Sequence, residues 1–543
     1  MSSKNLHADV VIVGSGVCGA LIGAQLAKAG KSVLILEAGP RVKRRDIVET
    51  YRDAPVKLSL ANMKLQGAGS PLPSIPHAPS TSGDYMEQNG PVKYNTSYLR
   101  VVGGTTWHFG SALWRLLPSE FKLNSLYGRG RDWPIGYDDL EKYYGLAELE
   151  LGVSGTDDQD ESGAGGNPSP TRASPYPMKQ LPLTYMFKTL AEKLSAGGYN
   201  PVWEPHGRAT RPYNQRPVCA GNNNCNPVCP IGAKYDGSMH CDIAESRGAT
   251  IMPNAVVYRL EDDDTGRIQA LWFKRPDGSE HKVTAKVFVV AAHTIETPKL
   301  LLMSKTRHSP NGIANNSDMV GRNLMDTTGI SVTMKTREPL WPGQGPTELL
   351  VFNRREGDFR RNAAQYKIKV RNTTPVSQYA ATLLEQGVLG TTLDRKIQEL
   401  SAHTLAWAVD FEVLPDPANR VTLSTKKFDA LGLPVPSLYY NLDDYWHAGT
   451  ELAMQDLNRF TQLLDAEIIK KNMKFENRQH PSGTTIMGDN PKDSVVNRDC
   501  RAHDHPNLYI AGTSVMSAST CMNPTLTAAA LSMRIAERIQ RAI

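Results

Sequence analysis

The pattern of apolar positions near the start of the chain predicts a compact strand–helix–strand unit. Residues 9–13 (DVVIV) form a short, nearly continuous apolar run, which is typical of a buried parallel strand. A helical pattern follows over 20–29 and ends at Gly30, a residue type that commonly ends helices. Residues 33–36 (VLIL) form a second apolar run. Together these runs predict a βαβ unit.

Further along the chain the apolar runs predict more strands and a last helix. Residues 249–257 and 283–292 are strand-like, and a turn-bearing segment separates them. The run 508–511 predicts another strand, which leads through Gly512 and a small-residue loop into a helix over 525–539.

The pattern changes between about 331 and 475. Apolar and polar residues alternate in 330–334 and 406–413, which predicts strands with one buried face. Amphipathic patterns near 379–400 and 444–470 predict helices beside these strands. We therefore expect an antiparallel sheet flanked by helices in this part of the chain.

Composition and charge exclude several classes of protein. The chain has 543 residues, of which 40% are hydrophobic and 21% charged, a globular composition. The formal net charge of +6 is a weak bias that does not indicate nucleic-acid binding. No apolar run approaches the roughly 18 residues of a membrane-spanning helix, and the first seven residues hold no signal-peptide core. We expect a protein without a nucleic-acid partner, membrane span or export signal of its own.

A glycine motif lies between the first strand and the first helix. Gly14 allows a tight turn, Gly16 lets the backbone approach a pyrophosphate, and Gly19 lets helix and strand pack closely. Glu37 ends the second strand, where an acid can hold ribose hydroxyls. The motif predicts a dinucleotide site, and its spacing fits NAD and FAD equally.

A second glycine segment, 102–108 (VGGTTWH), contains Gly103, Gly104 and Thr105. Such consecutive small residues let the backbone lie against a flat ring system. The segment is equally typical of a buried glycine bend. It therefore favours a flavin without establishing one.

Three of the seven cysteines lie close together in sequence. Cys219, Cys225 and Cys229 are spaced C-x5-C-x3-C with a proline directly after the last. Three thiolates on one loop leave a corner of a cubane unligated, which favours a [3Fe–4S] cluster over [4Fe–4S]. Zinc, with Cys241 or a histidine as fourth ligand, is the alternative. The odd cysteine count argues against a disulfide framework.

With these motifs the chain resembles the glucose–methanol–choline (GMC) oxidoreductase family. Within it the chain is most similar to the bacterial catalytic subunits of FAD-dependent glucose, fructose and related sugar dehydrogenases. The motifs span nearly the whole chain: GSGVCG (14–19), LEAG (36–39), VGGTTWHFG (102–110), HTIETPKLL (293–301), GRNLMD (321–326), DHPNLYIAGTSVM (504–516) and MNPTLTAAALSMR (522–534).

The resemblance implies a GMC fold of class α/β, α+β overall. A Rossmann-like FAD-binding domain is expected over 1–330 and 476–543, with inserted loops and the cysteine loop 215–235. A substrate domain with an antiparallel sheet plus helices is expected over 331–475. The resemblance also implies FAD as cofactor, with Val256, Gly512 and Thr525 among the residues around it.

For the cysteine loop, the resemblance implies a [3Fe–4S] cluster held by Cys219, Cys225 and Cys229. Such a cluster passes electrons one at a time to a partner. The implied partners are a small chaperone-like subunit and a multihaem cytochrome c subunit. The small subunit would carry the export signal and place the chain on the periplasmic face of the cytoplasmic membrane, bound only through partners; a cytoplasmic location is the alternative.

The family's catalytic pair maps onto His480 and Asn523. Neutral imidazole is available as a base near neutral pH, whereas an asparagine amide can orient a hydroxyl but cannot take its proton. We therefore expect His480 to be the base and Asn523 the orienting group. His503 and His505 are competing histidines, which we interpret as structural or cofactor-side residues.

The resemblance implies oxidation of a hydroxyl group of a sugar, sugar acid or polyol by hydride transfer to flavin N5. The chain departs from the pattern of this group at His293, in the residues 327–328 after the GRNLMD motif, and in the segment 478–483 around His480. The last two departures lie near the expected substrate side. The alternatives are an oxidase of the same fold that uses O₂, and a redox-inactive FAD-binding scaffold subunit.

Overall fold

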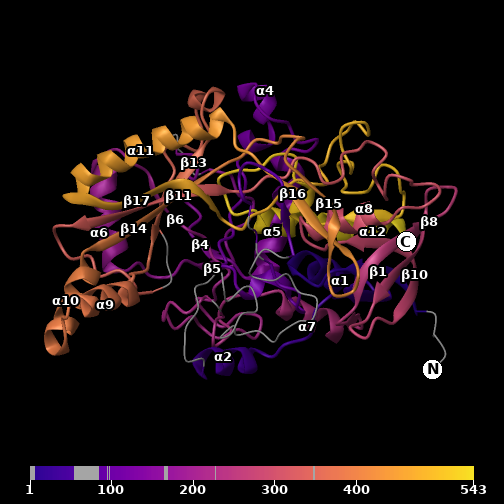
Figure 1. Cartoon of the computed structure of the whole chain (residues 1–543), viewed down its shortest axis with the longest axis horizontal. Coiled ribbons are helices and arrows are strands. Elements are labelled where there is room, and N and C mark those ends of the chain that lie inside the picture. The colour runs from indigo at the N-terminus through magenta and orange to yellow at the C-terminus, as the bar shows by residue number, and fades with distance from the viewer. Residues whose placement is uncertain are drawn as a thin grey trace.

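Two large sheets carry the fold and lie at opposite ends of the long axis (Figure 1). The computed structural model describes residues 6–53, 85–94, 96, 98–163, 169–226, 228–345 and 349–543. The sheet of β1 and β10 lies on the right of Figure 1 with α1 and α12, and the sheet of β11, β14 and β17 lies on the left with α6 and α11. The α/β class predicted from the sequence is confirmed.

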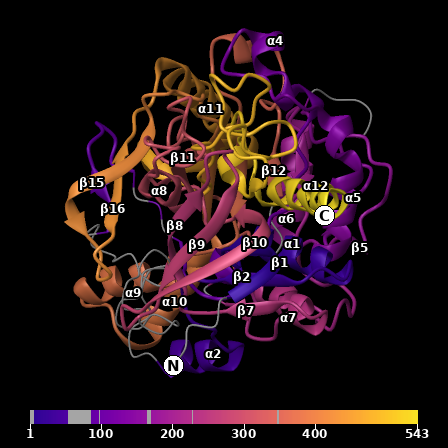
Figure 2. The same cartoon turned by 90° about the vertical axis from the view of Figure 1, so that its right-hand side faces the viewer.

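The first sheet is a Rossmann-like sheet with a parallel centre. Its parallel strands are β7 (Thr250–Met252), β2 (Val33–Leu36), β1 (Leu6–Val13), β10 (Glu280–Val290) and β18 (Leu508–Ile510). The first half of β10 also pairs antiparallel with β9 (Ile268–Lys274), which pairs with β8 (Val256–Asp262). Figure 2 looks along this end of the molecule, where β8, β9, β10, β1, β2 and β7 follow one another.

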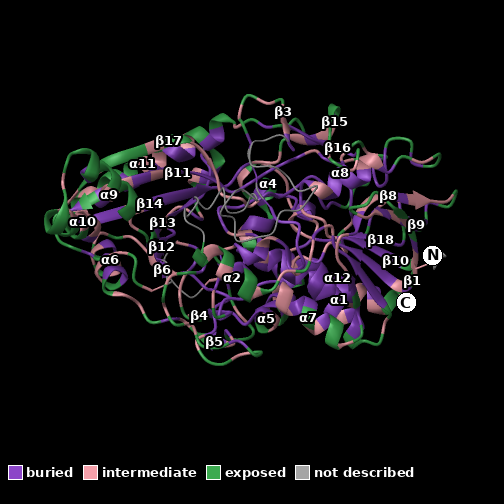
Figure 3. Cartoon of the chain, turned by 60° about the horizontal axis from the view of Figure 1, so that its bottom comes forward, coloured by how far each residue is buried: buried purple, intermediate pink, exposed green. Residues whose placement is uncertain are grey.

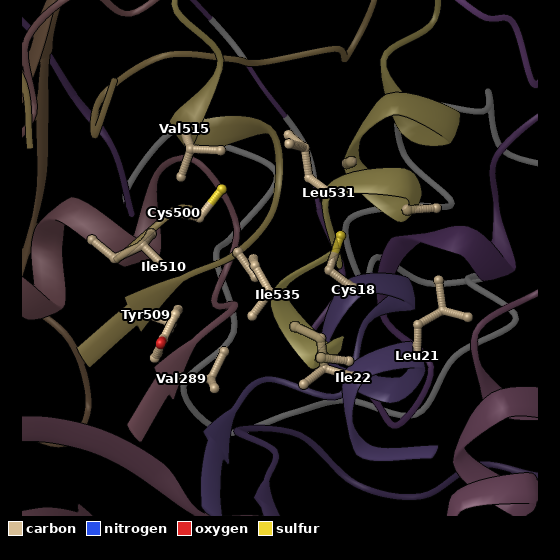
Figure 4. Close-up of a cluster of buried hydrophobic side chains, with 14 of the residues drawn as sticks. Cys18, Leu21, Ile22, Val289, Cys500, Tyr509, Ile510, Val515, Leu531 and Ile535 are labelled. Carbon is tan, nitrogen blue, oxygen red and sulfur yellow. The ribbon is translucent and has the colours of Figure 1, made fainter. Parts of the chain in front are cut away.

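Helices cover this sheet and bring the two halves of the sequence together. Helix α1 (Val17–Lys28) packs against α12 (Thr525–Ala542) and α7 (Ser238–Ser246), and α12 also packs against α5 (Tyr137–Leu151). Figure 4 shows Cys18 and Ile22 of α1 facing Leu531 and Ile535 of α12 over Val289 of β10. All five side chains are buried. The hydrophobic core therefore packs α12 against α1, although the two helices lie about 500 positions apart in sequence.

The second sheet is antiparallel throughout, as the alternating pattern predicted. Its order is β17 (Ala466–Asn477), β11 (Thr328–Thr336), β14 (Thr404–Phe411), β13 (Tyr366–Arg371), β12 (Leu349–Val351) and β6 (Pro201–Trp203). Helix α11 (Asp444–Leu464) packs on it and contacts α6 (Tyr185–Ala196). Because β6 comes from the first half of the chain, the sheet reaches beyond 331–475. The proposed domain boundaries stay a prediction.

Shorter elements connect the sheets. A three-stranded sheet contains β15 (Arg420–Phe428), β16 (Pro434–Tyr439) and β3 (Glu87–Gln88), and β4 (Ser154–Gly155) pairs with β5 (Met178–Lys179). The remaining helices are α2 (Arg44–Asp53), α4 (Leu123–Tyr127), α8 (Glu296–Met303), α9 (Val376–Glu385) and α10 (Gly390–Ala402), with short 3₁₀ helices at Gly104–Trp107, Pro118–Phe121, Asp358–Arg361 and Thr513–Val515. In Figure 3, α9 and α10 are mostly exposed, while central strands such as β1 and β14 are mostly buried.

Two helix predictions are wrong in their extent. The pattern over 444–470 predicts one helix, but α11 ends at Leu464, Asp465 takes a left-handed conformation (φ 48°), and β17 begins at Ala466. The pattern near 379–400 contains two helices, α9 and α10, separated by Gly387, whose φ is 75°. In both places a left-handed residue stops the helix, a signal that amphipathic spacing does not carry. No helix in the described ranges is long and apolar enough to span a membrane.

Candidate active site

The glycine turn after β1 is closely packed. A Cβ on Gly14 (φ 96°) would lie 2.5 Å from the carbonyl oxygen of Ala291, and one on Gly19 would lie 2.0 Å from that of Gly14. A Cβ on Gly16 would have no neighbour within 4 Å, because this residue faces the cavity at the start of α1. Gly14 and Gly19 therefore hold the turn, while Gly16 leaves room beside the helix N-terminus, where phosphates bind favourably.

Glu37 lies at the end of β2 and lines the same cavity. Its carboxylate accepts hydrogen bonds from the Ser15 amide (3.0 Å) and hydroxyl (2.7 Å) and from the Gly39 amide (3.0 Å). Burial raises the pKa of Glu37, and these hydrogen bonds oppose the rise. The acid is thus fixed against the glycine turn.

The second glycine segment touches the first. A Cβ on Gly104 (φ 62°) would lie 2.9 Å from Cα of Gly16, and one on Gly103 (φ 95°) would lie 2.6 Å from the amide nitrogen of Ser238. The hydroxyl of Thr105 accepts a hydrogen bond from the Leu99 amide at 3.0 Å. The two glycine segments, about ninety positions apart in sequence, therefore contact each other through their backbones at the N-terminus of α1.

One cavity of about 710 Å³ gathers most of the residues expected at the cofactor and the substrate. It is lined by Gly14, Gly16, Glu37, Gly104, Thr105, Cys225, Val256, His480, Gly512, Asn523 and Thr525. Among the described residues, Gly19, Gly103, Cys219 and Cys229 are not part of this lining. A lining with two bare-backbone loops and a buried acid fits FAD.

His480 and Asn523 face each other in this cavity. His480 follows β17 and Asn523 precedes α12, and Nδ2 of the asparagine lies 3.0 Å from Nε2 of the histidine. The backbone amide of His480 donates to Oδ1 of Asp326 (2.9 Å), and the Tyr94 hydroxyl donates to Oδ2 (2.6 Å). Burial raises the pKa of Asp326 to about 7. Asp326, itself hydrogen-bonded by Tyr94, therefore fixes the backbone of the loop that carries the imidazole.

A network of charged side chains contacts this pair through Asn523. Arg478 donates to Asp410 (2.5 Å) and to Glu476 (2.5 Å), and Nζ of Lys367 lies 3.6 Å from Asp410 and donates to Oδ1 of Asn523 (2.8 Å). Burial disfavours ionisation of Asp410, but Arg478 and Lys367 outweigh it and hold its pKa well below the usual range. These four side chains therefore form a network of ion pairs.

His293, one of the departures from the resembled family, also lines the cavity. Its ring stacks on Tyr98 with 4.3 Å between centroids, and its backbone has φ 77°. Burial lowers the pKa of His293 to about 4. This histidine is therefore neutral at physiological pH and offers a flat, uncharged surface.

The cysteine loop (215–235) contacts the second glycine segment (102–108). Cys225 and Cys229 are buried and Cys219 is half-buried. Burial raises the pKa of the Cys219 thiol, and the nearby Cys225 and Cys229 add to the rise. No three His, Cys, Asp or Glu side chains in the described ranges converge in a metal-binding arrangement. The expectation that three thiolates meet at a cluster therefore stays a prediction; the chemistry of the donor set, three soft sulfur ligands, suits an iron–sulfur group.

Lys234 connects the cysteine loop to the second glycine segment. This lysine is 1% exposed, and its Nζ donates to the carbonyl oxygens of Trp107 (3.0 Å) and Phe109 (2.9 Å). Burial lowers its pKa to about 8, against the opposing charges of Asp236, Cys225 and Cys229. The four other cysteines are also buried: Cys18, Cys241, Cys500 and Cys521.

The competing histidines have structural partners. Nε2 of His503 bonds the Ser494 hydroxyl (3.0 Å). Buried His505 donates from Nδ1 to the Gly266 carbonyl (2.7 Å) and accepts from the Ala314 amide at Nε2 (3.0 Å). Neither lines the cavity in the described part of the chain, in agreement with a structural interpretation.

Sequence reasoning missed three residues that support the site: Ser15, Asp326 and Lys367. Ser15 lies inside the glycine motif, so its contact with Glu37 could have been expected from the turn itself. Asp326 ends the GRNLMD motif, which marked the segment without assigning a role. Lys367 lies in a strand that alternates polar and apolar residues, so the sequence signal favoured solvent exposure.

Comparisons with family models match three parts of the chain. Two models described as GMC oxidoreductase match residues 206–328 and 415–532. A model described as an NAD(P)-binding Rossmann-like domain matches residues 12–45. The last range contains the glycine turn, and the other two contain the cysteine loop, His480 and Asn523.

Comparisons with individual proteins cover the full length. The chain is 43% identical to the fructose dehydrogenase large subunit of Gluconobacter japonicus over 99% of both chains. It is 27% identical to 2-methyl-1,2-propanediol dehydrogenase of Mycolicibacterium austroafricanum, over 100% of this chain and 96% of the relative. The crystal structure of a formate oxidase superposes with a TM-score of 0.64 at 17% identity, over 100% of this chain and 99% of the other, a likeness of fold.

Proposed function

The chain belongs to the GMC oxidoreductase family, and we propose that it is an FAD-dependent dehydrogenase that oxidises a hydroxyl group of a sugar, sugar acid or polyol. The observation that carries this proposal is the 3.0 Å contact between Asn523 and His480 inside the cavity. Oxidation of an alcohol carbon needs a base for the hydroxyl proton and a polar group that orients the oxygen. This pair supplies both.

The roles of the two side chains follow from their hydrogen-bonding capacity. A substrate hydroxyl that replaces the direct contact between them donates its proton to Nε2 of His480 and accepts a hydrogen bond from Nδ2 of Asn523. Asp326 and Tyr94 hold the histidine's loop in place while the proton moves. FAD, when bound, supplies the hydride acceptor at N5, and Gly14, Gly16, Gly104 and Glu37 would hold it.

We further propose that Cys219, Cys225 and Cys229 hold a [3Fe–4S] cluster through which electrons leave. Support comes from the donor set and from Cys225, which lines the cavity beside the second glycine segment. The chain's relative is named a large subunit, which supports an assembly with other chains. We propose a multihaem cytochrome c as electron acceptor and a small chaperone-like subunit as export partner, with the assembly on the periplasmic face of the cytoplasmic membrane.

Oxidase activity is the second candidate, and a specific observation favours it. The superposed formate oxidase shares the fold over the whole chain, and a 29% identical relative from Streptomyces lividus is named 6‴-hydroxyparomomycin C oxidase. An oxidase would return electrons to O₂ and make peroxide. The cysteine loop favours the dehydrogenase, because O₂ chemistry has no need of a one-electron exit.

A substrate panel tests the proposal directly. The purified chain is mixed with aldoses, ketoses including D-fructose, glycosides, sugar acids and polyols, first anaerobically with an artificial electron acceptor and then in air. We expect dye reduction with at least one of these compounds and little peroxide in air. Peroxide formation in step with oxidation would favour the oxidase, and a flavin that none of the compounds reduces would favour a scaffold subunit. Iron analysis of the same sample tests the cluster, since zinc or no metal would contradict it.

A further inference from the structure

Lys367 is a buried lysine whose role the reaction has not yet explained. It is the second residue of β13, its side chain is 0% exposed, and it lies directly opposite Asp410 of β14 in the antiparallel pairing. Burial of an ammonium group is costly unless the charge is paired and hydrogen-bonded. Asp410 supplies the opposite charge at 3.6 Å, and Asn523 accepts a hydrogen bond at 2.8 Å.

The chemistry of these partners fixes the orientation of the asparagine amide. A lysine ammonium has three donors and no acceptor, so the amide oxygen of Asn523 must face Lys367. The amide NH₂ then faces His480, where Nδ2 lies 3.0 Å from Nε2. Because an NH₂ group only donates, Nε2 must accept, so its lone pair points at Nδ2 of Asn523 and the neutral ring carries its proton on Nδ1. A substrate hydroxyl that replaces this hydrogen bond therefore meets an acceptor at Nε2.

From this we propose that Lys367 is a positioning residue: it locks the Asn523 amide so that Nε2 of His480 keeps the lone pair that receives the substrate proton. The inference rests on the proposed function, since it assigns His480 as the base. If the amide turned over, its oxygen would face Nε2 and favour a proton on that nitrogen. The ring would then present a donor where the reaction needs an acceptor.

Two observations separate this role from simple charge balance or substrate contact. Asp410 also accepts from Arg478 at 2.5 Å, so the carboxylate keeps a cation when Lys367 is removed. Lys367 does not line the cavity among the described residues, whereas Asn523 does. Lys367 can therefore act on a bound substrate only through a neighbour that lines the cavity, Asn523 or Asp410, and Asp410 keeps its pairing with Arg478.

A double-mutant cycle tests the proposal by anaerobic stopped-flow flavin reduction, with the sugar that reduces the parent fastest. Lys367→Met should lower the limiting rate about 10–100-fold, with bound FAD retained and the substrate Kd changed only a few-fold. In an Asn523→Ala background the same substitution should change the rate less than about twofold, because coupled residues are not additive. Equal losses in both backgrounds would overturn the proposal. Lys335→Met, which removes an exposed lysine of β11, is the control.

A second measurement does not depend on turnover. Nitrogen NMR of ¹⁵N-histidine-labelled protein, with the His480 signals assigned by loss in His480→Gln, reports which ring nitrogen carries the proton. We expect Nδ1 in the parent and a shift toward Nε2 in Lys367→Met; an unchanged tautomer refutes the proposal even if no substrate is found. Should Lys367→Met fail to fold, Asn523→Asp is the second variant. It keeps an acceptor for Lys367 but removes the amide donor that faces Nε2. A rate of flavin reduction near that of the parent would then contradict the proposal.

Discussion

Nδ2 of Asn523 and Nε2 of His480 lie 3.0 Å apart although 43 positions separate them in sequence. One residue follows the edge strand β17 of the antiparallel sheet and the other precedes the helix α12 on the Rossmann-like sheet. The contact therefore joins the two sheets at the point where a substrate hydroxyl would be held. The predictions below begin with this contact.

Removal of the base should separate chemistry from cofactor binding. His480→Ala should retain FAD, because the glycine turn and Glu37 that would hold it are unchanged, yet slow substrate reduction of the flavin by about 10²–10⁴-fold, the usual contribution of a general base. His503→Ala is the matched control, since His503 bonds Ser494 away from the cavity. Near-parent turnover in His480→Ala, measured by single-turnover flavin bleaching, would refute its assignment.

A methyl group at the contact between the two glycine loops should weaken cofactor binding. Gly104→Ala places a Cβ at φ 62° and 2.9 Å from Cα of Gly16, so the loops must move apart in addition to the roughly 1–2 kcal/mol of backbone strain. We expect the flavin content of the purified variant, measured by absorbance, to fall several-fold. Gly136→Ala has no neighbour within 4 Å and should keep full flavin content; equal loss in both variants would contradict the argument.

Substitution in the cysteine loop should block the electron exit and leave the first half of the reaction intact. In Cys225→Ser we expect substrate to bleach the flavin at the parent rate while reduction of a c-type cytochrome is lost and iron content falls. The two rates are measured on the same preparation. A cytochrome signal equal to that of the parent would remove this loop from the electron pathway.

The ion cluster around Glu296 should make stability fall on the acid side. Burial opposes ionisation of Glu296, but Arg100 and Lys299 outweigh it and lower its pKa to about 2, from 4.5. The carboxylate therefore contributes stability that is complete above pH 4.5 and is lost as the pH falls through the window toward 2, about 3 kcal/mol in all.

We test this contribution by thermal unfolding at pH 6 and pH 3. Between these values the unfolding temperature of Glu296→Gln should fall less than that of the parent, because the variant has no ionised carboxylate to lose. Glu467→Gln, on an exposed position of β17, should behave as the parent does. A drop as large in Glu296→Gln as in the parent would exclude the cluster as the cause.

The pattern of apolar residues was sufficient to predict an element where the segment's own sequence decides its structure. The apolar runs at 9–13 and 33–36 became β1 and β2, and the alternating run at 406–413 became β14 within two residues at either end. The pattern failed at 465–470, where pairing of β17 with β11 decides for a strand over a continued helix. Pairing across a sheet is a long-range interaction that local spacing does not report.

The same limit applies to the candidate site. Motifs predicted most of the residues that line the cavity, because glycine spacing reflects a backbone geometry that few other residues allow. Lys367 could not be found in this way: in the run YKIKVR (366–371) it has the pattern of a surface lysine. Only the register of β13 against β14, which sets it opposite Asp410, and the approach of Asn523 turn it into a buried group.

The packing of α12 on α1 has a consequence for biosynthesis. The glycine turn is made before the helix that completes its surroundings, and Asn523 and Thr525 come with that helix. A nascent chain without α12 therefore has no complete pocket, and coenzyme binding has to wait until α12 has been made. Any helper that keeps the early βαβ unit from aggregating would have to act during that interval.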